Sequence, residues 1–349
     1  MSRGHVYGPV PSRRLGISLG IDPIPKLVCT FDCIYCQLGR NKRKVAHWSE
    51  LDEAEAGAEA EFPTPRELLR EVEEALEKYE AIDCITVSGS GEPTLNPRLG
   101  ELAELLRQKT DVPLALITNS SLLIHDEVLE AAKRFDLVLP TLDAGDQATF
   151  HWVNRPAPGF DIHEIAEAIR RLVIEGAGEV WLEVMLVKSR GEGAKTNYNP
   201  DSIAKIIEKL RLISPHEVHL NTAVRPPAEE WVEPLTPLEL ERVKLQMEQE
   251  LPRQVIKVVP QRTARRSRLL REGESLEEIY KLLSIRPCTI AEIVSVTGLN
   301  PSEVRESLER LLEEGRGLKS ERDGEEYYMA CHAGQGQGQG QGQAGAGDG

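Results

Sequence analysis

The sequence predicts an α/β protein, built as an open partial (β/α)6 barrel followed by a small winged helix-turn-helix domain. From residue 64 to residue 227, amphipathic helical stretches alternate with short apolar runs, which is typical of βα units around a parallel sheet. That pattern ends at a group of prolines, Pro226, Pro227, Pro234 and Pro237. A second group of helices, closed by a hairpin, then occupies residues 275–330.

The expected barrel elements follow one another in βα order. Strands are expected at 17–21, 84–87, 114–118, 137–142, 180–187 and 217–222, and helices at 64–80, 97–109, 125–135, 161–175, 200–212 and 237–251. Thr64, Pro65 and Glu67 have the spacing of a capping box with proline in the first turn. Six such strands are fewer than the eight of a closed barrel, so we expect an open sheet with its chemistry at the carboxyl ends of the strands.

The C-terminal part has the element order of a winged helix. Helices are expected at 275–284, 289–298 and 300–315, followed by a hairpin over 317–330 that turns at Asp323 and Gly324. We therefore expect a barrel over 1–260, a linker over 261–274 and a winged helix-turn-helix-like domain over 275–332. The Gly- and Gln-rich tail, 333–349, has nothing to bury and should be disordered.

Composition sets limits on partners and compartment. The 349 residues are 40% hydrophobic, and no apolar run approaches the roughly 20 residues that a membrane helix needs. No signal-peptide core precedes the barrel, so we expect a cytoplasmic protein with reduced thiols and no membrane partner. The formal charge of −15 argues against a protein that coats nucleic acid through bulk positive charge. Basic residues cluster near 13–14, 40–44 and 262–271, and these clusters are either a local basic groove or solvated loops.

Three cysteines lie close together in LVCTFDCIYCQLG, at Cys29, Cys33 and Cys36. Three thiolates at this spacing can hold three corners of an iron-sulfur cubane and leave its fourth iron open to a ligand. The alternatives are a zinc site or buried thiols without function. Zinc would normally need a fourth Cys or His nearby, and the other cysteines are isolated along the chain.

The C-x3-C-x2-C pattern, with Tyr35 directly before Cys36, resembles the signature of the radical S-adenosylmethionine (SAM) superfamily, and residues 1 to about 230 fit its partial barrel. The resemblance implies one 4Fe-4S cluster, whose open iron is chelated by SAM. An electron from a donor such as flavodoxin or ferredoxin would then cleave SAM to methionine and a 5′-deoxyadenosyl radical. That radical would abstract a hydrogen atom from the substrate, while the protein positions the reactants and excludes solvent.

The resemblance also implies residues that contact SAM. The turn Ser88–Pro93, SGSGEP, is similar to the superfamily's GGEP motif with Ser90 in place of the first glycine, so Ser90, Gly91 and Glu92 are expected to meet the methionine amino group. Tyr35 should place its backbone near the adenine. Asn119 and Thr141, at the next two strand ends, are expected at the ribose or carboxylate, although bonds within local turns are an equal alternative.

Other polar residues are candidates for substrate contact. Asp143 ranks below Thr141 for the cofactor, while Glu183 and Met185 alternate along one strand and should face the barrel interior. The loop FHWVNRP could present groups that set specificity or could simply pack; its candidates are His151, Trp152, Asn154 and Arg155.

Residues 7–26 and 220–227 resemble an uncharacterised archaeal and bacterial branch of the superfamily, labelled as Fe-S oxidoreductases and distantly similar to wyosine synthases. Unlike those synthases, this chain has no cysteines ahead of Cys29 for a second cluster. The favoured substrate is RNA, such as tRNA, or protein, with RNA slightly ahead. A small metabolite or cofactor precursor is the alternative, and a nucleic-acid-binding Fe-S redox sensor is a third hypothesis. The helix over 301–314 carries Arg305 and Arg310 among five glutamates, so it matches a phosphate surface poorly.

Overall fold

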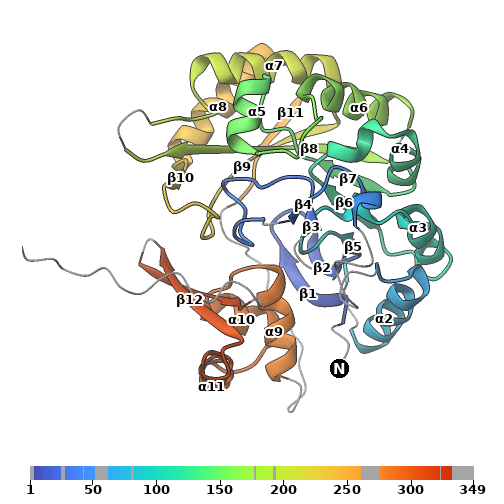
Figure 1. The fold of residues 1–349 in the computed structure, drawn as a ribbon, viewed down its shortest axis with the longest axis vertical. Helices are drawn as coiled ribbons and strands as arrows, with labels where there is room; N and C mark the ends of the chain where they lie inside the picture. Colours follow the sequence, from blue (N-terminus) through green and yellow to red (C-terminus); the bar gives the residue numbers. More distant parts are fainter. Residues whose placement is uncertain are drawn as a thin grey trace, which may run out of the picture.

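The fold is an open α/β barrel with a winged helix packed beside its first strands (Figure 1). The computed structural model describes residues 4–24, 28–41, 43–51, 62–79, 82–176, 178–191, 194–260, 275–322 and 324–331. The expected linker at 261–274, with its arginines, and the expected tail at 333–349 lie outside the described residues.

One sheet forms the centre of the barrel, and its strand order is β1-β2-β5-β6-β7-β8-β9-β11. β1 is antiparallel to β2, and the remaining neighbours along this order are parallel. The strands are β1 (Val6–Ser12), β2 (Gly16–Ile21), β5 (Cys84–Val87), β6 (Leu114–Thr118), β7 (Leu137–Pro140), β8 (Glu179–Ser189), β9 (Glu217–Thr222) and β11 (Val255–Val258). β10 (Val232–Pro234) pairs with the end of β8, and the short strands β3 (Val28–Cys29) and β4 (Arg43–Lys44) pair with each other.

Helices cover the outer face of this sheet (Figure 1). Their apolar residues and the buried side chains of the strands make one large core. The helices are α2 (Pro65–Lys78), α3 (Leu99–Arg107), α4 (Asp126–Ala132), α5 (Gln147–Val153), α6 (Ile162–Ile174), α7 (Pro200–Ile213) and α8 (Pro237–Glu250). The capping box predicted at Thr64 and Glu67 is confirmed, with Pro65 in the first turn.

The C-terminal elements have winged-helix order: α9 (Ser275–Ile285), α10 (Ile290–Thr297), α11 (Pro301–Glu313), β12 (Gly317–Arg322) and β13 (Glu325–Ala330). They enclose a second apolar core, and Val10 of β1 is buried within it. Arg225, which follows β9, donates to the carbonyl of Pro287 over 3.1 Å and forms a 3.0 Å ion pair with Glu292. The winged helix therefore packs directly on the barrel.

Among the strands and α-helices, β1, β3, β4, β10, β11 and α5 were not predicted. β1 contains Gly8, Pro9 and Pro11, residues that weaken a strand signal but are tolerated on the edge strand that β1 forms. Lys257 interrupts the apolar run of β11, in which only Ile256 is buried, and α5 has seven residues within a stretch interpreted as a loop, so neither shows a clear pattern. β11 adds a seventh strand to the parallel part of the sheet, whose ends, β1 and β11, are not paired with each other in the described part of the chain.

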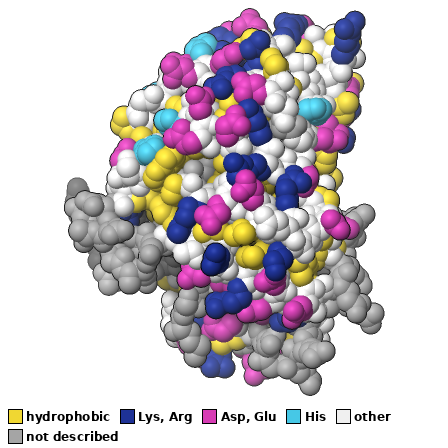
Figure 2. Space-filling view, turned by 90° about the vertical axis from the view of Figure 1, so that its right-hand side faces the viewer, with side chains coloured by type: hydrophobic (Ala, Val, Ile, Leu, Met, Phe, Trp, Pro, Cys, Tyr) yellow, Lys and Arg dark blue, Asp and Glu magenta, His cyan; other side chains and the backbone are white. Residues whose placement is uncertain are grey.

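Charged side chains of both signs lie on one face of the molecule. Figure 2 shows basic and acidic side chains interspersed over the face that it presents. Within the described ranges, no helix is long and apolar enough to cross a membrane.

Candidate active site

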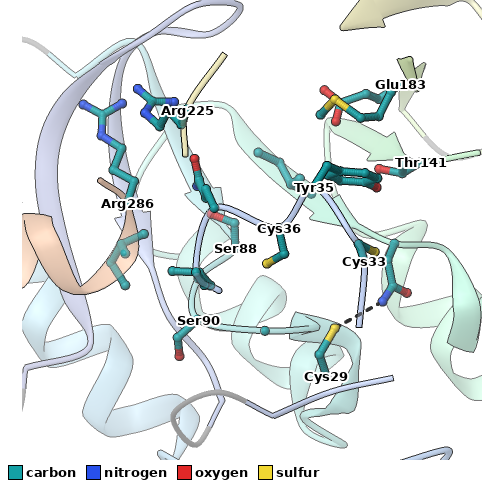
Figure 3. Close-up of a pocket in the computed structure, with 18 of the residues that line it drawn as sticks. Cys29, Cys33, Tyr35, Cys36, Ser88, Ser90, Thr141, Glu183, Arg225 and Arg286 are labelled. Carbon is teal, nitrogen blue, oxygen red and sulfur yellow. Dashed lines mark hydrogen bonds between the residues drawn. The ribbon is translucent and has the colours of Figure 1, made fainter. Parts of the chain in front are cut away.

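All nine residues predicted to bind the cluster or SAM line one cavity of about 400 Å³ at the carboxyl ends of the strands. This cavity brings together the cysteine segment, the SGSGEP turn and the ends of β6 and β7, as Figure 3 shows for the labelled residues. The nine are Cys29, Cys33, Tyr35, Cys36, Ser90, Gly91, Glu92, Asn119 and Thr141. A cavity of this size suits a small ligand.

The SGSGEP turn packs tightly on the start of the cysteine segment. A Cβ atom at Gly91 would lie 1.7 Å from the carbonyl oxygen of Val28, so only glycine fits there. The next residue, Glu92, donates its backbone N–H to the same carbonyl over 3.2 Å. Ser90 is held from the other side, since its hydroxyl and its N–H donate to the carboxylate of Asp22 over 2.8 and 3.2 Å. The turn thus fixes the strand that presents Cys29.

Glu92 is buried and joins two strand ends. Its Oε1 accepts from the N–H and hydroxyl of Thr94, over 3.1 and 2.5 Å, and from the hydroxyl of Thr118 over 2.7 Å. Its Oε2 accepts one bond, from the Asn119 N–H over 2.7 Å. Burial raises the pKa of Glu92, while these four donors favour its charged form. Only Oε2 retains clear capacity for a further donor.

Side-chain amides hold two of the three thiols. Asn119 donates to the sulfur of Cys29 over 3.5 Å (Figure 3, dashed line) and to the hydroxyl of Thr30 over 2.8 Å. Asn154 likewise donates to the sulfur of Cys33 over 3.5 Å. Burial raises the pKa of Cys29 to about 12 and also raises the pKa values of Cys33 and Cys36. Because a metal-bound thiol must be deprotonated, iron has to displace these protons when it binds.

Asp143 links the cysteine segment to the fourth and fifth parallel strands. Its buried carboxylate accepts from the hydroxyl of Tyr35, from the Asn154 amide over 2.7 Å and from the Met185 N–H over 2.8 Å. Burial raises the pKa of Asp143 to about 7. The Tyr35 ring is therefore engaged with the protein, and Asp143 orients groups around Cys33.

Replacing Asp143 with alanine should leave these three buried donors without an acceptor. We expect the free energy of unfolding to fall by about 3 kcal/mol, measured by urea denaturation. Asp126→Ala is the matched control, because the side chain of Asp126 is 80% exposed and its ion pair with Arg171 lies at the surface. An Asp143→Ala protein as stable as this control would contradict the role given to the carboxylate.

The opposite wall of the cavity carries Glu183 and Met185, and both side chains line the interior as their alternation predicts. Glu183 forms an ion pair with Arg14 and accepts from the amide of Asn221 over 3.2 Å. Thr141 also lines the cavity, and no described residue hydrogen-bonds its hydroxyl. Thr141 is thus available to a ligand.

Most side chains of the segment FHWVNRP contact other parts of the protein and do not face the cavity. His151 is exposed on α5, Trp152 stacks on Trp231 with ring centroids 6.4 Å apart, and Arg155 pairs with Glu229. None of the three lines the cavity, whereas Asn154 is buried against Asp143. Residues that were not predicted as site residues also contribute, namely Asp22, Thr118, Arg225 and Arg286.

The three thiols fit a cluster better than a single ion. Among the described residues, no three His, Cys, Asp or Glu side chains converge closely enough to hold one metal ion. A 4Fe-4S cluster does not require such convergence, since each thiolate binds a different iron. The donors also match, because three thiols line the cavity without a fourth cysteine.

Comparisons with known proteins agree with this arrangement. The model of the radical SAM superfamily matches residues 24–193, and the model of the ArsR family of bacterial regulatory proteins matches residues 278–315. A UPF0026 protein of Methanocaldococcus jannaschii is 32% identical over 326 residues, which cover 93% of this chain and 95% of that protein. The chain belongs to the UPF0026 family of the radical SAM superfamily. It is therefore an enzyme of the kind that uses SAM.

Two further matches of this UPF0026 chain are partial. A protein of Brachyspira hyodysenteriae named GTPase Obg is 34% identical over 315 residues, 89% of this chain but only 43% of that longer protein. The crystal structure of Streptococcus suis SuiB bound to S-adenosylmethionine superposes with a TM-score of 0.50 at 11% identity, covering 74% of this chain and 54% of SuiB. At that identity the likeness concerns the fold alone.

Proposed function

We propose that this radical SAM enzyme holds one 4Fe-4S cluster on Cys29, Cys33 and Cys36, cleaves SAM reductively and abstracts a hydrogen atom from a substrate bound in the same cavity. The observation that carries the proposal is the shared cavity, in which three thiols meet the polar ends of the parallel strands. When bound, the cluster and SAM would supply the electron transfer and the 5′-deoxyadenosyl radical.

Several residues predicted to contact SAM form hydrogen bonds to the protein itself. The side chain of Asn119 donates to the cysteine segment, and the side chain of Ser90 donates to Asp22. We therefore propose that these side chains position the cysteine segment and the SGSGEP turn, and that their backbone groups remain for SAM. Glu92 has acceptor capacity at Oε2, which suits the ammonium group of the methionine moiety. Thr141 offers its hydroxyl to the ribose or carboxylate, and Gly91 allows close approach of the backbone.

The shared cavity favours an enzyme over a redox sensor. A sensor needs iron ligands that respond to oxidation, but it does not need a chamber that joins these ligands to the ends of several strands. An enzyme that generates a radical needs such a chamber, because it must hold the substrate near SAM and keep solvent away.

Anaerobic reconstitution tests the proposal. The full chain should take up about four irons and four sulfides and, with dithionite as electron donor, should convert SAM to 5′-deoxyadenosine and methionine. Chromatography of the quenched reaction measures both products. A chain that carries a full cluster and binds SAM but never releases 5′-deoxyadenosine would overturn it.

A further inference from the structure

Arginines from three distant segments meet at one end of the cavity. Arg13 follows β1, Arg225 follows β9 and Arg286 follows α9 of the winged helix, and all three line the cavity. Figure 3 shows Arg225 and Arg286 on the side away from Cys29 and Cys33. The winged helix thus supplies part of the active-site wall.

The three guanidinium groups differ in how many hydrogen-bond partners the described residues give them. Arg225 is bound to Glu292 and to the Pro287 carbonyl. Arg13 donates to Asn221 over 3.2 Å and to the carbonyl of Pro260 over 3.4 Å. The Nε of Arg286 is buried and has no hydrogen-bond partner among the residues that the structure describes. Arg286 therefore contributes to the cavity wall a guanidinium group that the described residues do not fully satisfy.

The charges of this cluster do not balance within the described structure. Glu292 compensates Arg225, and Glu183 is paired with Arg14 rather than with the three arginines. Burial lowers the pKa of Arg13 to about 10; the positive charges of Arg225, Arg14 and Arg286 act in the same direction, and the negative charge of Glu183 opposes them. Guanidinium groups brought together at one end of a cavity repel one another, and a bound anion would relieve that repulsion.

We propose that Arg13, Arg225 and Arg286 form an anion subsite that binds a phosphate group of the substrate. Three arginines with one paired carboxylate leave two positive charges, which matches a phosphate better than a single carboxylate. The subsite lies away from the cysteines, so a phosphate held there would leave the cluster end of the cavity to SAM. The inference rests on the proposed function, since it names the substrate class of that same cavity.

The subsite also gives the winged helix a role that does not require its third helix to contact DNA. Glu303, Glu306, Glu309, Glu313 and Glu314 on and beside α11 disfavour a phosphate backbone, whereas Arg286, after α9, lies in the cavity. The segment that leads from α9 to α10 is thus the part of this domain that reaches the substrate.

Calorimetric titration of the full chain with inorganic phosphate, in the absence of SAM, tests the subsite with and without reconstituted cluster. Wild type should bind phosphate and should bind acetate much more weakly. Arg286→Ala should weaken phosphate binding about tenfold or more, and Arg286→Lys should restore part of it, because lysine keeps the charge but not the planar pair of donors. Arg305→Ala, exposed on α11, is the matched control and should bind phosphate as wild type does.

Ribose 5-phosphate and a short single-stranded RNA then distinguish a small phosphorylated substrate from nucleic acid as the source of the phosphate. Tighter binding of one of them, lost in Arg286→Ala, supports the subsite and identifies the source. Equal affinity of wild type and Arg286→Ala for phosphate, with unchanged thermal unfolding, would overturn the subsite, as would a preference for acetate. These titrations need no SAM cleavage, so such a result would overturn the subsite and leave the proposed radical chemistry standing. A failure to form 5′-deoxyadenosine would overturn the radical chemistry and would not affect the phosphate titrations.

Discussion

Replacement of Cys33 by alanine is expected to abolish both the cluster and SAM cleavage. Cys33 is the middle cysteine of the segment, and its sulfur is held by Asn154 at the side of the cavity where Asp143 lies. Without this thiolate, two protein ligands would remain for a cluster that needs three to stay fixed in the cavity. Iron content should fall to a small fraction of wild type, and 5′-deoxyadenosine should fall to the level of a blank without enzyme.

The control for this prediction is Cys331→Ala. Cys331 is also a free, half-buried cysteine, but it lies after β13 and does not line the cavity. It should therefore keep the iron content and the 5′-deoxyadenosine yield of wild type. Visible absorption and iron assays of the three proteins, reconstituted side by side, measure the effect. Wild-type iron and product in Cys33→Ala would rule out the assigned ligand set.

Much of the sheet could be predicted from local sequence, because a buried parallel strand is a short apolar run between turns. The bounds of β5, β6 and β9 agree with the predicted strands to the residue. The edge strands β1 and β11 were missed, because β1 carries prolines and a lysine interrupts the apolar run of β11. Pairing with a neighbouring strand stabilises them, and that contribution is not visible in the local sequence.

The candidate site could be predicted as a set of residues but not as a set of contacts. Motif spacing and strand ends placed Glu92, Asn119 and Tyr35 in one cavity, but they did not predict the hydrogen bonds that these side chains make to Thr118, Cys29 and Asp143. Arg286 was not predicted at all, since it comes from a different domain and carries no motif. Its place in the cavity depends on how the winged helix packs against β1, which no local pattern encodes.

Gly91→Ala is the second change with a large expected effect, and it tests the contact between the SGSGEP turn and the cysteine segment. The added Cβ would lie 1.7 Å from the Val28 carbonyl oxygen and 2.6 Å from Cδ1 of Ile24. The end of the Ile24 side chain can move, but the Val28 carbonyl cannot yield cheaply, because Val28 lies in β3 beside Cys29 and also accepts the Glu92 N–H. The turn and the cysteine segment must therefore separate.

We expect Gly91→Ala to lower the free energy of unfolding by about 3 kcal/mol, and we expect reconstitution to give much less cluster than in wild type. Gly100→Ala, within α3, is the matched control. Gly100 lies in the first turn of α3, and its added Cβ would meet only side-chain atoms, Cβ of Ala131 and Nη1 of Arg134, both at 3.3 Å, so we expect a small change in stability. Urea denaturation and iron assays separate the two effects. A Gly91→Ala protein that loses stability but keeps full iron would show that the turn supports the fold without fixing Cys29, whereas loss of both together requires the rigid contact described here.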